Sequence, residues 1–128
     1  PTLIGRAREK GVAAYVGDGA NRWPAVHRRD AAVAYRKAVE GGNPAARYHP
    51  VAEEGVPFRD IAEAIGRGLG VPAASKSADE AKGHFGWFAH FAAIDCASSS
   101  AATRDALGWS PTHRGLIEDL ETGTYFAG

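Results

Sequence analysis

The sequence predicts a mixed α/β protein that is mainly helical and contains a few short strands. Its clearest helix is 58–69, where apolar residues recur every three or four positions and so form one face. Its clearest strand is 12–16, a short apolar run with β-branched and aromatic residues that ends at a glycine turn. Glycines and prolines punctuate the chain between such segments, so every element is expected to be short.

The first third of the chain predicts the order helix, strand, strand, helix. Residues 2–10 have the composition of the last turns of a helix, which a glycine ends. The runs 12–16 and 25–27 are strand candidates that can pair with each other. From Asp30, an acceptable N-cap residue, the alanine spacing predicts a helix that ends at Gly41.

Residues 47–53 are a third strand candidate, because the run is short, aromatic and partly β-branched. Pro50 cannot donate a ladder hydrogen bond, which places this strand at the edge of a sheet. A lone strand cannot satisfy its own backbone groups, so it needs neighbours that this chain barely supplies. We therefore expect the missing strands to lie upstream.

Small helices are expected in the last third of the chain. The segment 77–80 has the S-x-x-E form of a capping box and predicts a helix start. An aromatic segment, 84–94, follows it. The serine run 98–100 supplies an N-cap for a helix that Gly108 ends, and 115–121 predicts a final amphipathic turn or two.

The composition is that of one globular domain over residues 1–128, long enough for one core. Fifteen basic and fifteen acidic side chains cancel, and no long block of like charge occurs. We therefore expect neither nucleic acid nor a membrane surface as a partner.

No apolar run approaches a membrane span or a signal peptide, and the single cysteine, Cys96, excludes an internal disulfide framework. These features favour a cytoplasmic location, with Cys96 as a packed structural thiol. The sequence has no methionine and begins with proline, which indicates a piece of a longer protein.

The sequence contains none of the catalytic or cofactor-binding motifs that we searched for. No strand is followed by G-x-G-x-x-G, and no tyrosine has a lysine four residues later. The five histidines and Cys96 do not fall at metal-ligand spacings. We therefore assign no catalytic, cofactor-binding or metal-binding residue from the sequence.

Two segments are candidates for substrate binding. In the first, Asn21, Arg22 and Trp23 would project from a turn over a pocket, with His27 facing the same side. The alternative is that this corner only caps the following helix and hydrogen-bonds its histidine. In the second segment, His84, Trp87 and Phe88 would form an aromatic lid over the pocket, or else pack into the core.

The motif G-D-G-x-N-x-x-x-x-V-H-x-x-D-A-A in residues 17–32 resembles the C-terminal half of extended short-chain dehydrogenases/reductases, the NAD-dependent epimerase/dehydratase superfamily. Residues 47–70 resemble the strand and helix at the far edge of that family's sheet, and 103–120 resemble its terminal L-G-W-x-P segment. Residues 84–109 are most similar to the atypical NAD(P)-dependent oxidoreductases of this group. The resemblance covers almost the whole chain.

The resemblance implies a Rossmann-like fold of which this chain is the substrate-binding C-terminal part. NAD or NADP would be bound mainly by a missing N-terminal part, which would also carry the Tyr-x-x-x-Lys machinery. Members that act on sugar nucleotides carry an arginine four residues before the motif histidine, where this chain has Trp23. An indole cannot replace a bidentate guanidinium, so a small carbonyl or alcohol substrate is favoured.

The leading interpretation is therefore an NAD(P)-dependent oxidoreductase or epimerase, with this chain inactive alone and partnered by the N-terminal half of the same protein. One alternative is a non-catalytic NAD(P)-binding redox sensor of the same fold. Another is a self-sufficient helical domain that binds a hydrophobic ligand through residues 84–88. A homodimer also remains open as an alternative.

Overall fold

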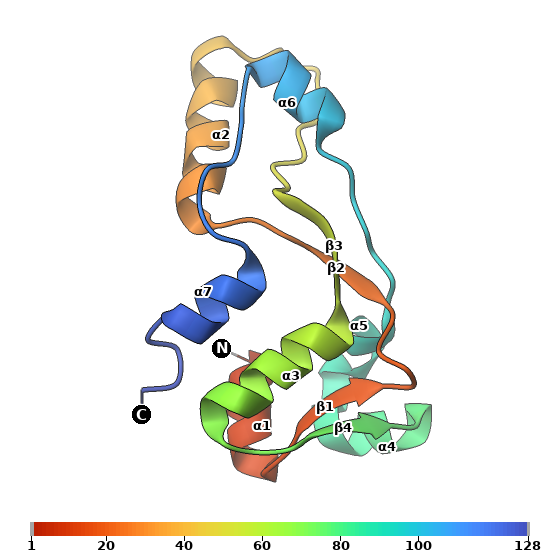
Figure 1. Cartoon of the computed structure of the whole chain (residues 1–128). Coiled ribbons are helices and arrows are strands. Elements are labelled where there is room, and N and C mark those ends of the chain that lie inside the picture. The colour runs from red at the N-terminus through yellow and green to blue at the C-terminus, as the bar shows by residue number, and fades with distance from the viewer. Residues whose placement is uncertain (1, 128) are drawn as a thin grey trace.

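The computed structural model describes residues 2–127 and shows a mixed α/β fold with short strands, so the predicted class is confirmed (Figure 1). The elements in chain order are α1 (Thr2–Lys10), β1 (Ala13–Val16), β2 (Arg22–Ala25), α2 (Arg28–Gly41), β3 (Glu53–Pro57), α3 (Phe58–Leu69), β4 (Ala73–Lys76), α4 (Ala78–Phe85), the 3₁₀ turn η1 (Gly86–Phe88), α5 (Ala89–Ala93), α6 (Ala101–Leu107) and α7 (Leu116–Thr122).

The molecule is elongated, with two groups of elements joined by β2 and β3. Figure 1 shows α1, β1, β4, α3 and α4 at the lower end and α2 and α6 at the upper end. The long ribbons of β2 and β3 run between the two ends, and α7 lies beside α3. The chain thus leaves the lower group after β1, builds α2, and returns through β3 into α3.

The described strands form two separate two-stranded sheets. β1 pairs with β4 in parallel, with Ala13 opposite Ala73 and Val16 opposite Lys76. β2 pairs with β3 in the antiparallel direction and has an irregularity between Trp23 and Ala25. The predicted pairing of 12–16 with 25–27 is therefore wrong. β4 was not predicted, because its sequence AASK has no β-branched or aromatic residue.

The predicted strand at 47–53 is also wrong, since the strand begins only at Glu53. Pro50 removes a ladder donor from this segment. The amide of His49 instead donates to the Thr103 hydroxyl at 2.7 Å, and the amide of Ala52 donates to the Ala25 carbonyl at 2.9 Å. Residues 47–52 are thus satisfied by isolated bonds rather than by a ladder.

Two predicted helix starts have different outcomes. The N-cap of α2 is His27 and not Asp30, because the His27 side chain accepts a bond from the Arg29 amide and Asp30 lies within the first turn. The capping box of α4 is confirmed, with Ser77 and Glu80 bonded in both directions.

The core forms around α3. Its apolar face is buried against β1, α1 and α7. Ile61, Ala62 and Ile65 belong to one buried cluster with Ile4 and Leu120, whereas Phe58 belongs to a second cluster with Phe85. The regular apolar spacing of 58–69 therefore fixes the helix around which the lower part of the molecule packs.

Candidate functional site

One candidate site is an open hollow of about 380 Å³ beside the carboxyl ends of the parallel strands β1 and β4. Its lining includes Val16 at the end of β1, Lys82 on α4, and Trp87 and His90. We call it the aromatic cleft. In open α/β sheets, ligands bind in crevices outside the carboxyl ends of the strands, so this position is the one expected for a ligand.

One exposed ring, Trp87, lines the aromatic cleft, and that of Phe91 lies next to it. Trp87 is 73% exposed and Phe91 is 49% exposed, with ring centroids 6.2 Å apart in a T-shaped pair. Phe88 is half-buried and packs edge-on against Trp23 at 5.8 Å. One side of the 84–94 segment is thus anchored in the protein, while Trp87 and Phe91 are presented to solvent, where a ligand can stack on them.

Asn21 and Arg22 hold the aromatic segment in place. The Asn21 amide donates to the carbonyls of Ala92 and Ile94 at 3.0 Å each. Arg22 binds the Asp95 carboxylate through its backbone amide and through two guanidinium nitrogens, Nε at 3.0 Å and Nη2 at 2.9 Å. This contact lowers the pKa of Asp95 to about 2 through the Arg22 hydrogen bonds, so the carboxylate is charged at neutral pH.

Trp23 packs against both Phe58 of the core and Phe88 of the aromatic segment. Its ring packs edge-on against Phe58 at 5.0 Å, in addition to its contact with Phe88. The buried indole Nε1 has no hydrogen-bond partner within residues 2–127. Asn21, Arg22 and Trp23 are therefore brought into contact with the chain around Phe88–Asp95, and the role of Asn21, Arg22, Trp23 and Phe88 in substrate binding stays a prediction.

His84 lies apart from these groups. It is buried on α4, 7% exposed, and its ring contacts Phe85 edge-on. Burial lowers the pKa of His84, and the charges of Lys76, Lys10 and Arg6 lower it further. The imidazole is therefore neutral at physiological pH. Trp87, by contrast, opens onto the aromatic cleft.

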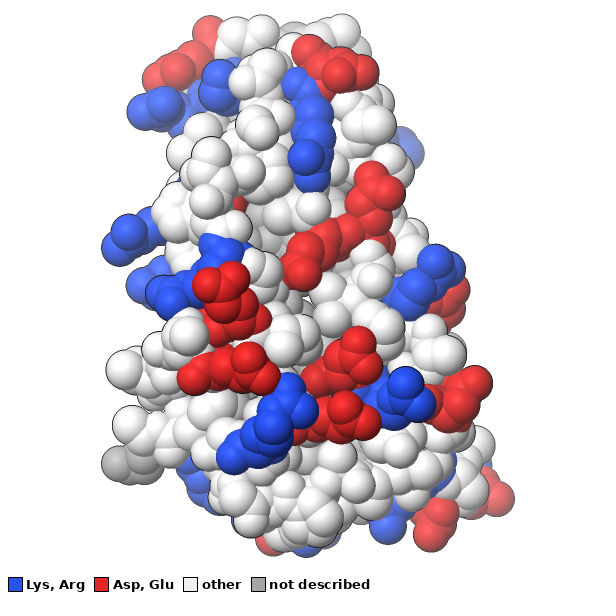
Figure 2. All heavy atoms as spheres, viewed as in Figure 1, with Lys and Arg blue, Asp and Glu red and all other residues white. Residues whose placement is uncertain are grey.

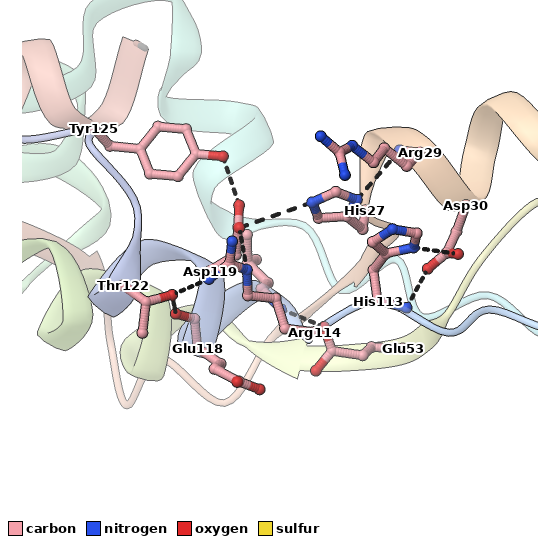
Figure 3. A network of polar contacts seen from close by, with 11 residues as sticks. His27, Arg29, Asp30, Glu53, His113, Arg114, Glu118, Asp119, Thr122 and Tyr125 are labelled. Carbon is pink, nitrogen blue, oxygen red and sulfur yellow. Dashed lines mark hydrogen bonds and ion pairs between the residues drawn. The ribbon is translucent and has the colours of Figure 1, made fainter.

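His27 lies at a second hollow, of about 390 Å³, between the start of α2 and α7. Its ring stacks on that of His113, with centroids 4.5 Å apart and planes 5° apart. Figure 3 shows the two rings side by side, with Arg29 near His27 and Asp30 next to His113 on its other side. We call this second site the histidine hollow.

Asp30 holds His113 in place at the histidine hollow. Its carboxylate is 2% exposed and accepts bonds from the amides of Thr112 and His113 and from His113 Nδ1, the last at 2.7 Å. Burial by itself would raise the pKa of Asp30, but these bonds from His113 and Thr112 outweigh it and lower the pKa to about 2. The acceptor fixes the proton of His113 on Nδ1.

Asp119 on α7 organises the opposite side of the hollow. It forms an ion pair with Arg114 Nε at 2.9 Å and accepts a hydrogen bond from the Tyr125 hydroxyl, and its Oδ1 lies 3.9 Å from His27 Nε2 (Figure 3). The Asp119 bond raises the pKa of Tyr125. The phenol therefore stays protonated as a donor.

The sequence predicted only His27 among these residues. The other residues of the hollow meet it only because the chain around α7 returns to the start of α2, where Asp30 and His113 are 83 positions apart in the sequence. No spacing pattern in the sequence signals a contact of that separation. Cys96, predicted to be packed, is exposed in the structure.

Two further properties of residues 2–127 bear on function. No three His, Cys, Asp or Glu side chains among them lie close enough together to hold a metal ion. None of the helices described for these residues combines the length and apolar character needed to cross a membrane.

Comparison with known proteins gives relatives of unassigned function and similarity to a solved structure. No protein-family model matches the chain. It is 48% identical over 126 residues to the uncharacterized protein C2A9.02 of Schizosaccharomyces pombe, covering 98% of this chain and 43% of that protein. It is 46% identical over 120 residues to the uncharacterized protein YLL056C of Saccharomyces cerevisiae, covering 94% of this chain and 40% of that protein. The chain thus spans less than half the length of these curated relatives.

Among solved structures, the chain is similar to RMD from Pseudomonas aeruginosa complexed with NADPH. The TM-score is 0.61 at 16% sequence identity, and the match covers 94% of this chain and 40% of the RMD chain. The similarity establishes a shared fold for this part of RMD: the chain has the fold of part of an NADPH-binding protein.

Proposed function

We propose that this chain is the substrate-binding C-terminal portion of an NAD(P)-dependent oxidoreductase or epimerase that acts on a small carbonyl or alcohol. The observation that carries the proposal is the parallel β1–β4 pair with one edge of β1 left without a strand among the described residues. An open edge of this kind can accept a further strand from another polypeptide segment. The resemblance in residues 17–32 supports a dinucleotide-binding half as that segment.

The hydrogen bonds of β1 support this argument. The amides of Ala13 and Gly17 donate to the carbonyls of Pro72 and Lys76 at 2.9 Å. Because donors alternate along a strand, the amides of Ala14 and Val16 point to the other edge. Ala14 is nevertheless buried, 5% exposed. Parallel sheets are normally covered on both faces and extend over several strands, which supports further parallel pairing at this edge.

The position of the aromatic cleft supports substrate binding. It lies at the carboxyl ends of β1 and β4, where the crevice of an extended parallel sheet would open. Its exposed Trp87 offers apolar surface, while Lys82 and His90 offer hydrogen bonds. Such a mixture suits a small molecule with one polar group better than a diphosphate.

The described residues do not by themselves fit a nicotinamide dinucleotide. The glycine turn after β1 leads into β2 and not into a helix, so it offers no helix N-terminus to a pyrophosphate. Its Gly19 is required by packing, because a Cβ there would lie 2.6 Å from Cβ of Arg59. We therefore assign the cofactor to the other half and assign to this chain the orientation of substrate and the exclusion of water.

A chimera tests the proposal. The matched 126 residues of C2A9.02 are replaced by this chain, and NADPH and NADH binding is measured by fluorescence for the chimera and for the chain alone. We expect binding by the chimera only. Turnover of a panel of small aldehydes, ketones and alcohols is then followed by the change in NAD(P)H absorbance.

Trp87→Ala in the chimera is expected to raise KM for an accepted substrate by about tenfold without changing the dissociation constant of NADPH, because a stacking surface is lost. The matched control is Tyr35→Ala, which removes an exposed ring, 67% exposed, from α2. Tight binding of NAD(P)H by the chain alone would contradict the assignment of the cofactor site. A chimera that binds NADPH but reduces no compound of the panel would favour the redox sensor.

A further inference from the structure

We propose that the histidine hollow between α2 and α7 binds a phosphate group. This site is independent of the proposed substrate cleft. The aromatic cleft is built from β1, α4, η1 and α5, whereas the histidine hollow is built from the start of α2 and residues 113–125. Its volume of about 390 Å³ is sufficient for a phosphate and part of the molecule that carries it.

The first argument is the charge of the lining. Three arginines, Arg28, Arg29 and Arg114, line the hollow against one carboxylate, Asp119. Asp119 already has two partners, Arg114 at 2.9 Å and the Tyr125 hydroxyl. Blue spheres gather at the left edge of Figure 2, at the height where α2 begins in Figure 1. The hollow therefore has a surplus of positive charge in a protein whose total formal charge is zero.

The second argument is that Arg28 and Arg29 have no carboxylate within 4.0 Å among the described residues. Both occupy the first turn of α2, where the partial positive charge of the helix disfavours cations. Only Asp30 in that turn is acidic, and its carboxylate is committed to His113 and Thr112. An anion in the hollow would relieve this local repulsion.

The third argument is the state of His27. Its Nδ1 accepts from the Arg29 amide at 3.2 Å, so a neutral ring carries its proton on Nε2. That Nε2 lies 3.9 Å from Asp119 Oδ1, beyond hydrogen-bond length. His27 is thus a donor at the hollow with capacity for another acceptor, and stacking on His113 holds its ring in place.

Together these groups offer what a phosphate needs. Guanidinium groups bind phosphate oxygens in pairs of parallel bonds, and an imidazole N–H supplies a third direction. A carboxylate ligand would use only part of this set, since it has two oxygens and one charge. Arg114 and Arg28 also lie near the Tyr125 hydroxyl, where their charges act against the stronger effect of Asp119 on the pKa of that phenol. All three arginines line the same hollow.

The test uses protection of arginines from phenylglyoxal, an arginine-directed reagent, in the purified protein. Peptide mass spectrometry measures the modification of each arginine with and without inorganic phosphate, methyl phosphate or pyrophosphate at constant ionic strength. We expect each effective ligand to slow modification of Arg28 and Arg29 several-fold and to leave Arg36 unchanged. Arg36 is the internal control, because it is an exposed arginine on the same helix that pairs with Glu40.

Titration of the same ligands by calorimetry gives the affinity. Arg28→Gln and Arg29→Gln are each expected to weaken binding by about tenfold, because each removes one charge-assisted contact, whereas Arg36→Gln leaves it unchanged. Binding of inorganic phosphate but not methyl phosphate would assign the site to the free ion, and comparable binding of both would assign it to a phosphate ester. The proposal would be overturned if no ligand slowed the modification of Arg28 and Arg29 more than that of Arg36. It would also be overturned if Arg36→Gln weakened ligand binding as much as Arg28→Gln and Arg29→Gln do.

Discussion

At the scale of single residues, Asp30 connects segments far apart in the chain. Its side chain accepts from the amides of Thr112 and His113, and its backbone carbonyl accepts from the buried Trp109 indole at 3.0 Å. One residue of α2 thereby fastens the segment that follows α6. Because each donor is partly or fully buried, loss of the acceptor leaves them unsatisfied.

We expect Asp30→Asn to lower the free energy of unfolding at pH 7 by about 2 kcal/mol. A neutral side-chain amide cannot accept all the bonds that the carboxylate accepts from Thr112 and His113. The folded-state pKa of about 2 lies below the ordinary 3.8, so Asp30 contributes its stability above about pH 4. That contribution is lost as the pH falls toward 2. Urea unfolding at pH 7 and at pH 3 measures both effects.

The control for this prediction is Asp105→Asn on α6, an exposed carboxylate. It should change the free energy of unfolding by less than about 0.5 kcal/mol at either pH. If Asp30→Asn lost as much stability at pH 3 as at pH 7, the stabilising role of the charged carboxylate would be refuted.

The turn after β1 contains a matched pair of glycines. Gly17 and Gly19 both have positive φ, 60° and 66°. A Cβ at Gly17 meets no atom within 4 Å, whereas one at Gly19 would lie 2.6 Å from Cβ of Arg59 and 2.7 Å from the Tyr15 ring. The two positions therefore separate backbone strain from steric overlap.

We expect Gly17→Ala to destabilise the protein by about 1 kcal/mol, the cost of a left-handed non-glycine residue. Gly19→Ala should cost about 2 kcal/mol more, because α3 must move away from the turn. Chemical denaturation of both variants measures the difference. Equal losses would show that the approach of Arg59 to Gly19 is not a tight contact.

At the scale of elements, β1 is the strand whose surroundings are incomplete. α1, α3 and α4 pack on it, and β4 pairs with one edge. Along that edge the amides of Ala13 and Gly17 are bonded, and by alternation so is that of Tyr15. The amides of Ala14 and Val16 have no strand partner among the described residues.

This pattern predicts alternating hydrogen exchange along β1. In the chain alone, the amides of Ala13, Tyr15 and Gly17 should exchange slowly and those of Ala14 and Val16 rapidly, because only the first set is hydrogen-bonded. In the chimera with C2A9.02, Ala14 and Val16 should become protected as a further strand pairs there. Residue-resolved exchange by NMR makes this comparison. Rapid exchange of Ala14 and Val16 in a chimera that binds NADPH would exclude pairing at this edge.

At the scale of the whole molecule, the upper and lower groups of elements are joined by polar contacts and by the β2–β3 ribbon. Arg104 on α6 donates to the carbonyl of Ala52 at 3.0 Å, and the Glu53 carboxylate accepts from the Leu116 amide at 2.7 Å. Positive and negative side chains are intermixed over the face in Figure 2. This pattern agrees with the zero net charge and shows no extended basic stripe on that face.

Local rules predicted the elements that depend on neighbours in the sequence. The apolar face of 58–69 gave α3, the S-x-x-E pattern gave the capping box of α4, and Gly70 and Gly108 end their helices in the left-handed conformation. These features depend on interactions within a few residues. The start of α2 was misassigned because the His27 side chain caps the helix, whereas the Asp30 carboxylate accepts from the distant His113 amide instead.

Strand pairing and the composition of both hollows could not be predicted in this way. The runs 12–16 and 25–27 looked compatible, but β1 paired with β4, whose short polar sequence carries no strand signal. His27 and His113 stack only because the chain after α6 returns past the start of α2. Such contacts join distant positions through packing, for which periodicity holds no information.

The sequence by itself determined the mixed α/β class, the helices with clear faces and caps, and the aromatic and glycine-rich segments from which a site could be built. The tertiary structure alone decided which strands are neighbours, that one edge of β1 has no strand beside it among residues 2–127, and that Trp87 and His27 lie at different hollows. The physical reason is the distance along the sequence over which each interaction acts. Capping and amphipathic spacing act over a single helical turn, whereas strand register and convergent side chains depend on how the whole chain packs.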